Sequence, residues 1–351
     1  MSYLPKPKIH HPQLPKNTLG LTRRDYEGSL STLCAGCGHD SVSAALIQAC
    51  FELDLPPHRV GKLSGIGCSS KTPTYFLGPA HGFNSVHGRM PSIASGAAAA
   101  NRDLVYIGVS GDGDTASIGL GQFIHAMRRG VNMLYLVENN GTYGLTKGQF
   151  SATADVGSKS KAGKANPYTP IDLVQLALQM GAGFVGRSFS GDKEQLVPLL
   201  KAAIAYPGFA FIDVISPCVT FNNHESSTKS YVATRRRDRA VVEADFVPME
   251  QEITAAYAPG THHTVTLHDG SRLHLKKLAD DYDPYDRIAA MDYLHRNQAD
   301  GSLLTGLLYL DGEPSDMHAM LGTDSTALNR LPFESLNPGA AALDAVNAAL
   351  R

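Results

Sequence analysis

Residues Val105–Gly144 read VYIGVSGDGDTASIGLGQFIHAMRRGVNMLYLVENNGTYG. The stretch begins with an apolar segment, passes through a loop with alternating glycine and aspartate, and continues as a helical pattern. A second apolar segment follows and ends in the polar loop 138–142. Strand, glycine-rich loop, helix and strand in this order are typical of α/β proteins with parallel strands.

The alternation continues on both sides of this stretch, and it predicts a doubly wound, mostly parallel sheet with helices on both faces. The expected strands are Val60–Ile66, Leu104–Val109, Asn132–Val137, Gly183–Phe189 and Phe209–Ile215. The expected helices run from Asp40 or Ser41 to Leu53, from Pro91 to Ala100, from the Gly-Asp loop to Arg129, from Ile171 to Met180, and from Asp192 to Ala205.

Composition suggests three regions. Residues 1–29 are rich in proline and lysine, which predicts an extended arm of the kind that often lies on a partner subunit. Residues 30–247 carry the alternating pattern. Residues 248–351 form an extension without an assigned role, with an expected hairpin at Thr264–Leu275 around an Asp-Gly turn and a helix at Asp286–Arg296.

Charge and hydropathy exclude several classes of protein. The net charge is −2 over 351 residues, whereas nucleic-acid binders usually present a clearly basic face. The dense basic cluster Arg235–Arg237 is more typical of a solvated surface. The N-terminal residues lack the apolar core of a secretory signal, and apolar runs are too short to span a membrane. We therefore expect a cytoplasmic protein whose cysteines stay reduced.

The loop Gly111–Ala116 fits the G-x-G-x-x-A pattern of dinucleotide-binding sites. Glu138, at the end of the next strand, is near the position expected of a ribose ligand, so an NAD-dependent dehydrogenase is an alternative. Charge argues against it, because Asp112 and Asp114 would repel a diphosphate unless a divalent cation lies between them. Mg²⁺ takes one or two carboxylates together with phosphate oxygens, which favours a metal-bound diphosphate.

The loop after the second strand offers further oxygen ligands at the same edge of the sheet. Gly111-Asp112-Gly113 and Asn139-Asn140 are separated by 25 residues, and this pair of elements resembles the thiamine diphosphate motif. The resemblance implies that Asp112, Asn140 and the Thr142 carbonyl bind Mg²⁺.

Four of the five cysteines lie in loops, next to the ends of expected strands or helices. They are Cys34, Cys37, Cys68 and Cys218, whereas Cys50 falls on the apolar stripe of a helix and is expected in the core. Four thiolates suit either zinc or a [4Fe–4S] cluster, and spacing alone does not decide between them. A non-catalytic zinc-containing subunit is therefore another alternative.

Five motifs occur in the order seen in one family: Cys34-x-Gly-Cys37-Gly-His39, Gly65-Ile-Gly67-Cys68-Ser-x-Lys71, His87-Gly-Arg89, Gly111-Asp-Gly-Asp114 and Thr146-x-Gly-Gln149. Over about residues 30–247 the chain resembles the β subunit of 2-oxoacid:ferredoxin oxidoreductases, and most of all those that act on 2-oxoglutarate.

The resemblance implies a heterodimer or a dimer of heterodimers. The β chain would hold thiamine diphosphate, Mg²⁺ and one [4Fe–4S] cluster bound by the four loop cysteines. The enzyme would decarboxylate a 2-oxoacid, pass electrons to ferredoxin and transfer the acyl group to coenzyme A, reversibly in some cases. For 2-oxoglutarate the products would be succinyl-CoA and CO2; pyruvate and branched-chain 2-oxoacids are alternative substrates.

Site residues are expected in the loops of these motifs. The cofactor-binding set is Ile66, Gly67, Cys68, Ser69, His87, Gly111, Asp112, Gly113, Asp114, Asn140, Thr142, Gly144, Leu145 and Thr146. Lys71 and Arg89 are candidate ligands for substrate carboxylates, although surface ion pairs would explain them equally well. His87 is a candidate catalytic residue or a packed structural one.

Thiamine activation needs a carboxylate on the aminopyrimidine ring. Within residues 30–247 no glutamate stands in a recognisable context for it, and in the family the partner chain supplies it. We therefore expect this chain to be inactive without an α subunit.

Overall fold

The computed structural model describes residues 11, 13–158, 164–221, 254–266, 272–278, 282–298 and 303–350. Its centre is a nine-stranded sheet in the order β2-β1-β3-β4-β8-β7-β11-β10-β9. The first six of these strands are parallel, which confirms the predicted doubly wound α/β fold. The strands are β1 (Val60–Ser64), β2 (His81–Asn84), β3 (Val105–Gly111), β4 (Met133–Asn139), β7 (Phe184–Phe189), β8 (Phe209–Ile215), β9 (His262–Thr266), β10 (Arg272–Lys277) and β11 (Leu303–Leu310).

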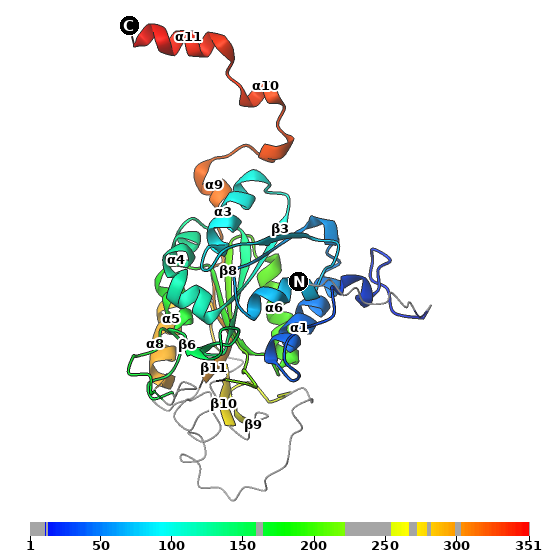
Figure 1. Cartoon of the computed structure of the whole chain (residues 1–351), viewed down its shortest axis with the longest axis vertical. Coiled ribbons are helices and arrows are strands. Elements are labelled where there is room, and N and C mark those ends of the chain that lie inside the picture. Colours follow the sequence, from blue (N-terminus) through cyan, green and yellow to red (C-terminus); the bar gives the residue numbers. More distant parts are fainter. Residues whose placement is uncertain are drawn as a thin grey trace, which may run out of the picture.

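Helices cover both faces of the sheet (Figure 1). The longer ones are α1 (Gly38–Glu52), α3 (Met90–Ala100), α4 (Leu120–Arg128), α5 (Leu173–Gln179), α6 (Lys193–Ala205) and α8 (Arg287–Gln298). The shorter ones are α2 (Thr72–Tyr75), α9 (Met317–Leu321), α10 (Phe333–Leu336) and α11 (Gly339–Ala349). A small hairpin, β5 (Thr142–Tyr143) with β6 (Gln149–Phe150), lies outside the main sheet.

The core has two parts because successive side chains of a strand point to opposite faces. All of β4 is buried; Tyr135 and Val137 pack with α4 and α5 on one face, whereas Leu134 and Leu136 pack with α1 and α6 on the other. Phe123 of α4 lies 4.8 Å from Tyr135 and 5.1 Å from Phe211 between ring centroids. Continuous apolar strands are what a sheet covered on both faces requires.

Three local features differ from the sequence-based expectation. Helix α1 begins at Gly38, because Cys37 is the extended residue before it. Residues Gly113–Ile118 form a π-helical turn ahead of α4, so the Gly-Asp loop is wound rather than open. The edge strand β2 was not predicted, since all four of its residues are exposed and carry no apolar pattern.

The N-terminal segment packs on its own chain from Asn17 onward. Tyr26 is fully buried, and its ring meets Phe51 of α1 edge-on. The amide of Asn17 donates hydrogen bonds to the Tyr26 hydroxyl (2.8 Å) and to the Phe51 carbonyl (3.2 Å). This part of the expected arm therefore belongs to the folded body, and residues 1–10 lie outside the described part of the chain.

The C-terminal region extends the same sheet. Strand β11 pairs antiparallel with β7, and β10 pairs parallel with β11 and antiparallel with β9. The expected hairpin is thus formed, although its turn lies outside the described residues, as do the expected boundary at 247 and 248 and the cluster Arg235–Arg237. Residues 303–310 are a central part of the fold rather than an appendage.

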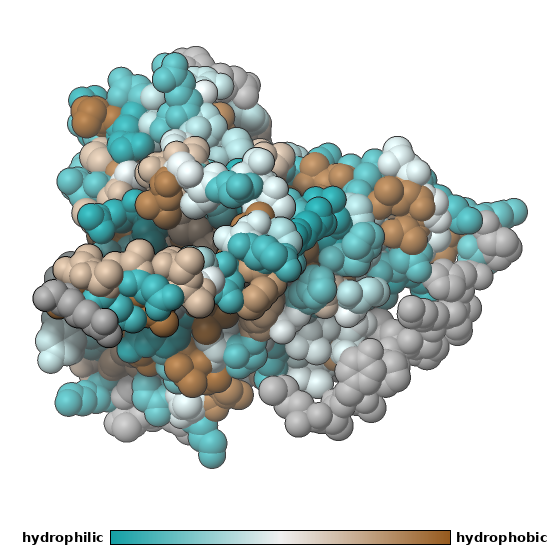
Figure 2. Space-filling model, turned by 90° about the horizontal axis from the view of Figure 1, so that it is seen from above, coloured by the Kyte–Doolittle hydropathy of each residue, from teal (hydrophilic) through white to brown (hydrophobic). Residues whose placement is uncertain are grey.

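Beyond β11, helices α10 and α11 project away from the body (Figure 1). Phe333 is 70% exposed and Leu343 is 62% exposed. Figure 2 views the molecule from this end and shows apolar side chains among hydrophilic ones on the surface. In the described part of the chain, no helix is both long and apolar enough to cross a membrane.

Candidate functional site

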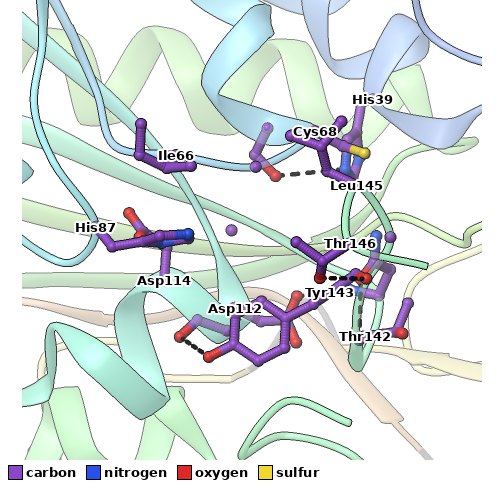
Figure 3. Close-up of a pocket in the computed structure, with 16 residues that line it drawn as sticks. His39, Ile66, Cys68, His87, Asp112, Asp114, Thr142, Tyr143, Leu145 and Thr146 are labelled. Carbon is purple, nitrogen blue, oxygen red and sulfur yellow. Dashed lines mark hydrogen bonds and ion pairs between the residues drawn. The ribbon is translucent and has the colours of Figure 1, made fainter. Parts of the chain in front are cut away.

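A pocket lies at the carboxyl ends of β1, β3 and β4, where parallel sheets bind ligands (Figure 3). Its empty volume is about 440 Å³, counting the part open to solvent. The lining residues are His39, Ile66, Gly67, Cys68, Ser69, His87, Gly111, Asp112, Gly113, Asp114, Asn140, Thr142, Tyr143, Gly144, Leu145 and Thr146. Every residue expected to bind the cofactor is among them, together with His39 and Tyr143, which sequence reasoning did not select.

Asp112 is held rigidly at the floor of this pocket. Its side chain is buried, and Oδ1 accepts a hydrogen bond from the backbone N–H of Asn140 (3.2 Å). Oδ2 accepts from the hydroxyls of Thr153 (2.6 Å) and Ser151. The Asn140 side-chain oxygen accepts from the N–H of Thr142 (3.1 Å). The two loops are therefore tied together, and their carboxylate and amide oxygens are the ligand types that Mg²⁺ takes.

Asp114 has a different role from Asp112. Its Oδ1 accepts hydrogen bonds from Nδ1 of His87 (2.5 Å) and from the N–H of Gly88 (2.8 Å). A side chain at Gly65 would overlap the Asp114 carboxylate, so only glycine allows the loop after β1 to pass there. Asp114 thus fixes His87 at the rim of the pocket rather than adding a second free carboxylate.

Two of the three candidate catalytic residues lie away from the pocket. Arg89 is exposed, and its guanidinium donates to the Gln122 side chain (2.9 Å). Lys71 follows Cys68 by three residues in the sequence. Its side chain is partly buried, and it is not among the residues that line the pocket. His87 does line the pocket. The substrate-binding roles of Lys71 and Arg89 stay predictions.

A buried ammonium fixes helix α2 and the residues after it, which follow the loop that carries Cys68. Lys62 of β1 donates three hydrogen bonds to the backbone carbonyls of Pro73 (2.7 Å), Phe76 (2.7 Å) and Leu77 (2.8 Å). Burial lowers the pKa of Lys62 to about 8. The three carbonyl acceptors favour the charged form, and they join β1 to α2 and to the residues that follow it.

In the described part of the chain the four loop cysteines form no disulfide, and Cys50 is buried in the core as expected. A Cβ placed on Gly144 would lie 3.5 Å from Sγ of Cys68 and 3.8 Å from Sγ of Cys218, so these two sulfurs are neighbours. The Thr220 hydroxyl lies 3.7 Å from Sγ of Cys34.

Burial raises the pKa of the Cys68 thiol, and the nearby Cys218 and Cys34 raise it further. Burial likewise raises the pKa of Cys37, with a further contribution from Cys218. The sulfurs of the three loops are therefore close enough to influence one another.

Among the described residues, no three or more histidine, cysteine, aspartate or glutamate side chains are grouped tightly enough to hold a metal ion. A single zinc ion needs sulfurs about 2.3 Å from one point. A [4Fe–4S] cluster holds its thiolates further apart because four iron atoms lie between them. The donor set itself, four cysteine side chains with Cys68 and Cys218 as neighbours, is chemically suited to either zinc or a [4Fe–4S] cluster.

Glu138 is enclosed by protein at the end of β4. Its carboxyl oxygens accept hydrogen bonds from the Thr72 hydroxyl (2.9 and 3.1 Å), and Oε2 lies 3.7 Å from Nδ1 of His39. Burial raises the pKa of Glu138 well above its usual value. The Glu138 side chain has no exposed surface and therefore cannot contact a ribose. The dinucleotide-binding alternative thus loses the residue expected to bind the ribose.

The buried imidazole of His39 predicts a loss of stability in acid. Burial lowers the pKa of His39 from 6.5 to about 4. The folded chain then binds fewer protons than the unfolded chain between these values, so stability falls as the pH drops from about 6.5 to about 4. The full loss is about 3 kcal/mol at 1.36 kcal/mol per pKa unit.

Urea unfolding of the metal-free chain at pH 7 and at pH 4 measures this loss. The His39→Gln variant should show a shallower decline than the wild type. Glu138 is present in both proteins, so its own titration does not account for the difference. Equal declines would show that His39 takes up its proton as readily in the folded chain as in the unfolded chain.

Comparison with known proteins agrees with the geometry. Residues 65–214 match the family described as "Thiamine pyrophosphate enzyme, C-terminal TPP binding domain". A 2-oxoacid:ferredoxin oxidoreductase subunit beta from Saccharolobus solfataricus is 43% identical over 203 residues, which cover 58% of this chain and 66% of that protein. The equivalent subunit from a Sulfolobus species is 39% identical over 216 residues, 61% of this chain and 68% of that protein.

A third relative and a solved structure agree with these two matches. The 2-oxoglutarate oxidoreductase subunit KorB of Mycobacterium tuberculosis is 41% identical over 191 residues, 54% of this chain and 51% of that protein. The chain thus aligns with about two thirds of the archaeal relatives and half of the mycobacterial one. A solved structure of 2-oxoglutarate:ferredoxin oxidoreductase from Magnetococcus marinus superposes with a TM-score of 0.69 at 27% identity, over 90% of this chain and 94% of that one. The chain belongs to the family of 2-oxoacid:ferredoxin oxidoreductase β subunits.

Proposed function

We propose that this chain is the subunit of a cytoplasmic 2-oxoacid:ferredoxin oxidoreductase that holds both thiamine diphosphate with Mg²⁺ and a [4Fe–4S] cluster. The observation that carries the proposal is that the pocket and the cysteine loops are in direct contact. Cys68 lines the pocket, and Gly144, from the opposite loop, borders the sulfurs of Cys68 and Cys218. A cofactor in this pocket would lie directly beside the ligands of an electron carrier.

The residues divide the work between them. Asp112, Asn140 and the Thr142 carbonyl would bind Mg²⁺, and Cys34, Cys37, Cys68 and Cys218 would bind the cluster. Bound thiamine supplies the chemistry that removes CO2 from a 2-oxoacid and makes its electrons available. His87, fixed by Asp114, presents its other ring nitrogen from the rim, where it would orient the substrate.

The reaction needs a second chain. Among the described residues, the carboxylates that line the pocket are those of Asp112 and Asp114, and both are engaged as described above. An α subunit would therefore supply the carboxylate that activates thiamine, in a heterodimer or a dimer of heterodimers. Ferredoxin would accept the electrons and coenzyme A the acyl group.

We propose 2-oxoglutarate as the substrate. Support comes from the names of relatives in Mycobacterium tuberculosis and Methanocaldococcus jannaschii, the latter a 2-oxoglutarate synthase subunit KorB 38% identical over 192 residues. The Magnetococcus marinus structure was solved with 2-oxoglutarate, coenzyme A and succinyl-CoA bound.

The test is anaerobic purification of this chain together with its α subunit. The complex should contain about four irons and four sulfides per β chain, and its colour should bleach with dithionite. It should reduce methyl viologen with 2-oxoglutarate and coenzyme A faster than with pyruvate or a branched-chain 2-oxoacid. A colourless complex that contains zinc would contradict the cluster, and a preference for pyruvate would contradict the substrate.

A further inference from the structure

The three loops that carry the cysteines meet at one buried imidazole. His39 lies two residues after Cys37 and is 1% exposed. Its Nδ1 shares a hydrogen bond of 2.6 Å with the hydroxyl of Ser216, and its Nε2 shares one of 3.3 Å with the hydroxyl of Ser69. Ser69 directly follows Cys68, and Ser216 lies two residues before Cys218. Figure 3 shows His39 next to Cys68 at the end of the pocket.

The backbones of two of these loops are also in close contact. A Cβ on Gly38 would lie 2.6 Å from the Ser216 hydroxyl and 2.8 Å from the Ser190 hydroxyl, so a larger residue would push the loops apart. The N–H of Gly38 donates to the Pro217 carbonyl at 3.5 Å. The first turn of α1 is thus fitted directly against the loop that leads to Cys218.

A neutral imidazole suits this position chemically. It has one donor and one acceptor nitrogen on opposite sides of a rigid ring, so it bridges two hydroxyls whose own donors and acceptors adjust by rotation. Glu138, 3.7 Å from Nδ1, and Thr72, which donates to Glu138, close the network from the side of the sheet. No flexible side chain of similar size fixes the separation of two loops in this way.

We propose that His39 is a positioning residue that holds the three cysteine-bearing loops at the separation needed to bind a [4Fe–4S] cluster. It acts through Ser69 and Ser216 and touches no part of the cluster itself. The proposal rests on the proposed function, because it concerns the same cluster. Outer-shell hydrogen bonds of this kind typically change metal affinity by about 10–100-fold.

The experiment compares His39→Ala with a matched control in the anaerobically purified complex of both subunits. His318 is also a buried histidine that uses both ring nitrogens, with the Thr323 hydroxyl (2.8 Å) and the Ala98 carbonyl (3.0 Å). It lies on α9, and none of its partners is a pocket residue. His318→Ala therefore reproduces the loss of a buried, doubly hydrogen-bonded imidazole without affecting the cysteine loops.

Two quantities are measured: iron and sulfide per chain, and the rate of iron loss to an excess of a chelator. His39→Ala should lose iron at least about 10-fold faster than wild type. His318→Ala should lose iron at the wild-type rate. His39→Asn, whose amide reaches the Ser216 side, should recover part of the cluster retention.

Each result decides the question. Equal iron loss from His39→Ala and wild type overturns the positioning role, as does equally fast loss from His318→Ala. If His39→Ala fails to fold, Ser216→Ala, which removes the hydroxyl that meets Nδ1 of His39, replaces it, and wild-type iron retention in this variant overturns the proposal. A wild-type complex without iron and sulfide contradicts the proposed function as well, and this outcome is distinguishable because it does not depend on any substitution.

Discussion

Replacing Asp112 by asparagine should abolish Mg²⁺-dependent binding of thiamine diphosphate. The substitution keeps the shape of the side chain but removes the charge that would bind the cation. Ser151 and Thr153, which now donate to Oδ2, have hydroxyls that rotate to accept from the new amide, so the fold should persist. We expect the affinity to fall at least about 100-fold, since losing an outer-shell partner alone costs 10–100-fold.

Calorimetric titration of the cofactor in the presence of Mg²⁺ measures this effect. Asp292→Asn is the control, because that carboxylate is exposed and pairs only locally with Arg296. The iron content of the Asp112→Asn complex should equal that of wild type, which separates the diphosphate site from the cluster. Cofactor affinity within about threefold of wild type would exclude Asp112 from the metal site.

Replacing Arg187 by methionine should destabilise the chain by about 3–5 kcal/mol, the usual result of breaking a buried ion pair. Arg187 is 5% exposed and donates to Asp172 (2.6 Å) and Asp213 (3.0 Å). Burial alone would raise the pKa of Asp172, but the Arg187 guanidinium holds it below its usual value. Methionine fills the space but takes the guanidinium away from the buried Asp213 and the partly buried Asp172.

The effect should extend to the pocket. Asp213 also accepts from the Asn139 amide (3.0 Å), and Asn139 accepts from the Thr153 hydroxyl (3.1 Å) that donates to Asp112. Urea unfolding of Arg187→Met is compared with Arg296→Met, which breaks an exposed pair of side chains four residues apart and should cost no more than about 0.5 kcal/mol. Equal losses in the two variants would refute a structural role for this network.

The parallel sheet and its pocket could be predicted because their signals are local. Strands β4 and β8 are mostly apolar, and the loops with Asp112 and Asn140 follow strands that end at one edge. The sequence did not separate the roles of Asp112 and Asp114, because only the folded chain brings His87 and Gly88 to Asp114. His39 was missed as a site residue because its partners are 30 and 177 residues away in the chain.

The position of β11 has a consequence for how the chain is made. Translation delivers β7 and β8 long before residues 303–310, so β7 is an unpaired edge of the nascent sheet until β11 emerges from the ribosome. An open edge with unpaired N–H and C=O groups is a template for incorrect pairing with other chains. Because β11 lies between β7 and β10 in the sheet, a chain released from the ribosome before β11 is made would keep β7 as an unpaired edge strand. Premature termination before residue 303 should therefore produce aggregates rather than a shorter working subunit.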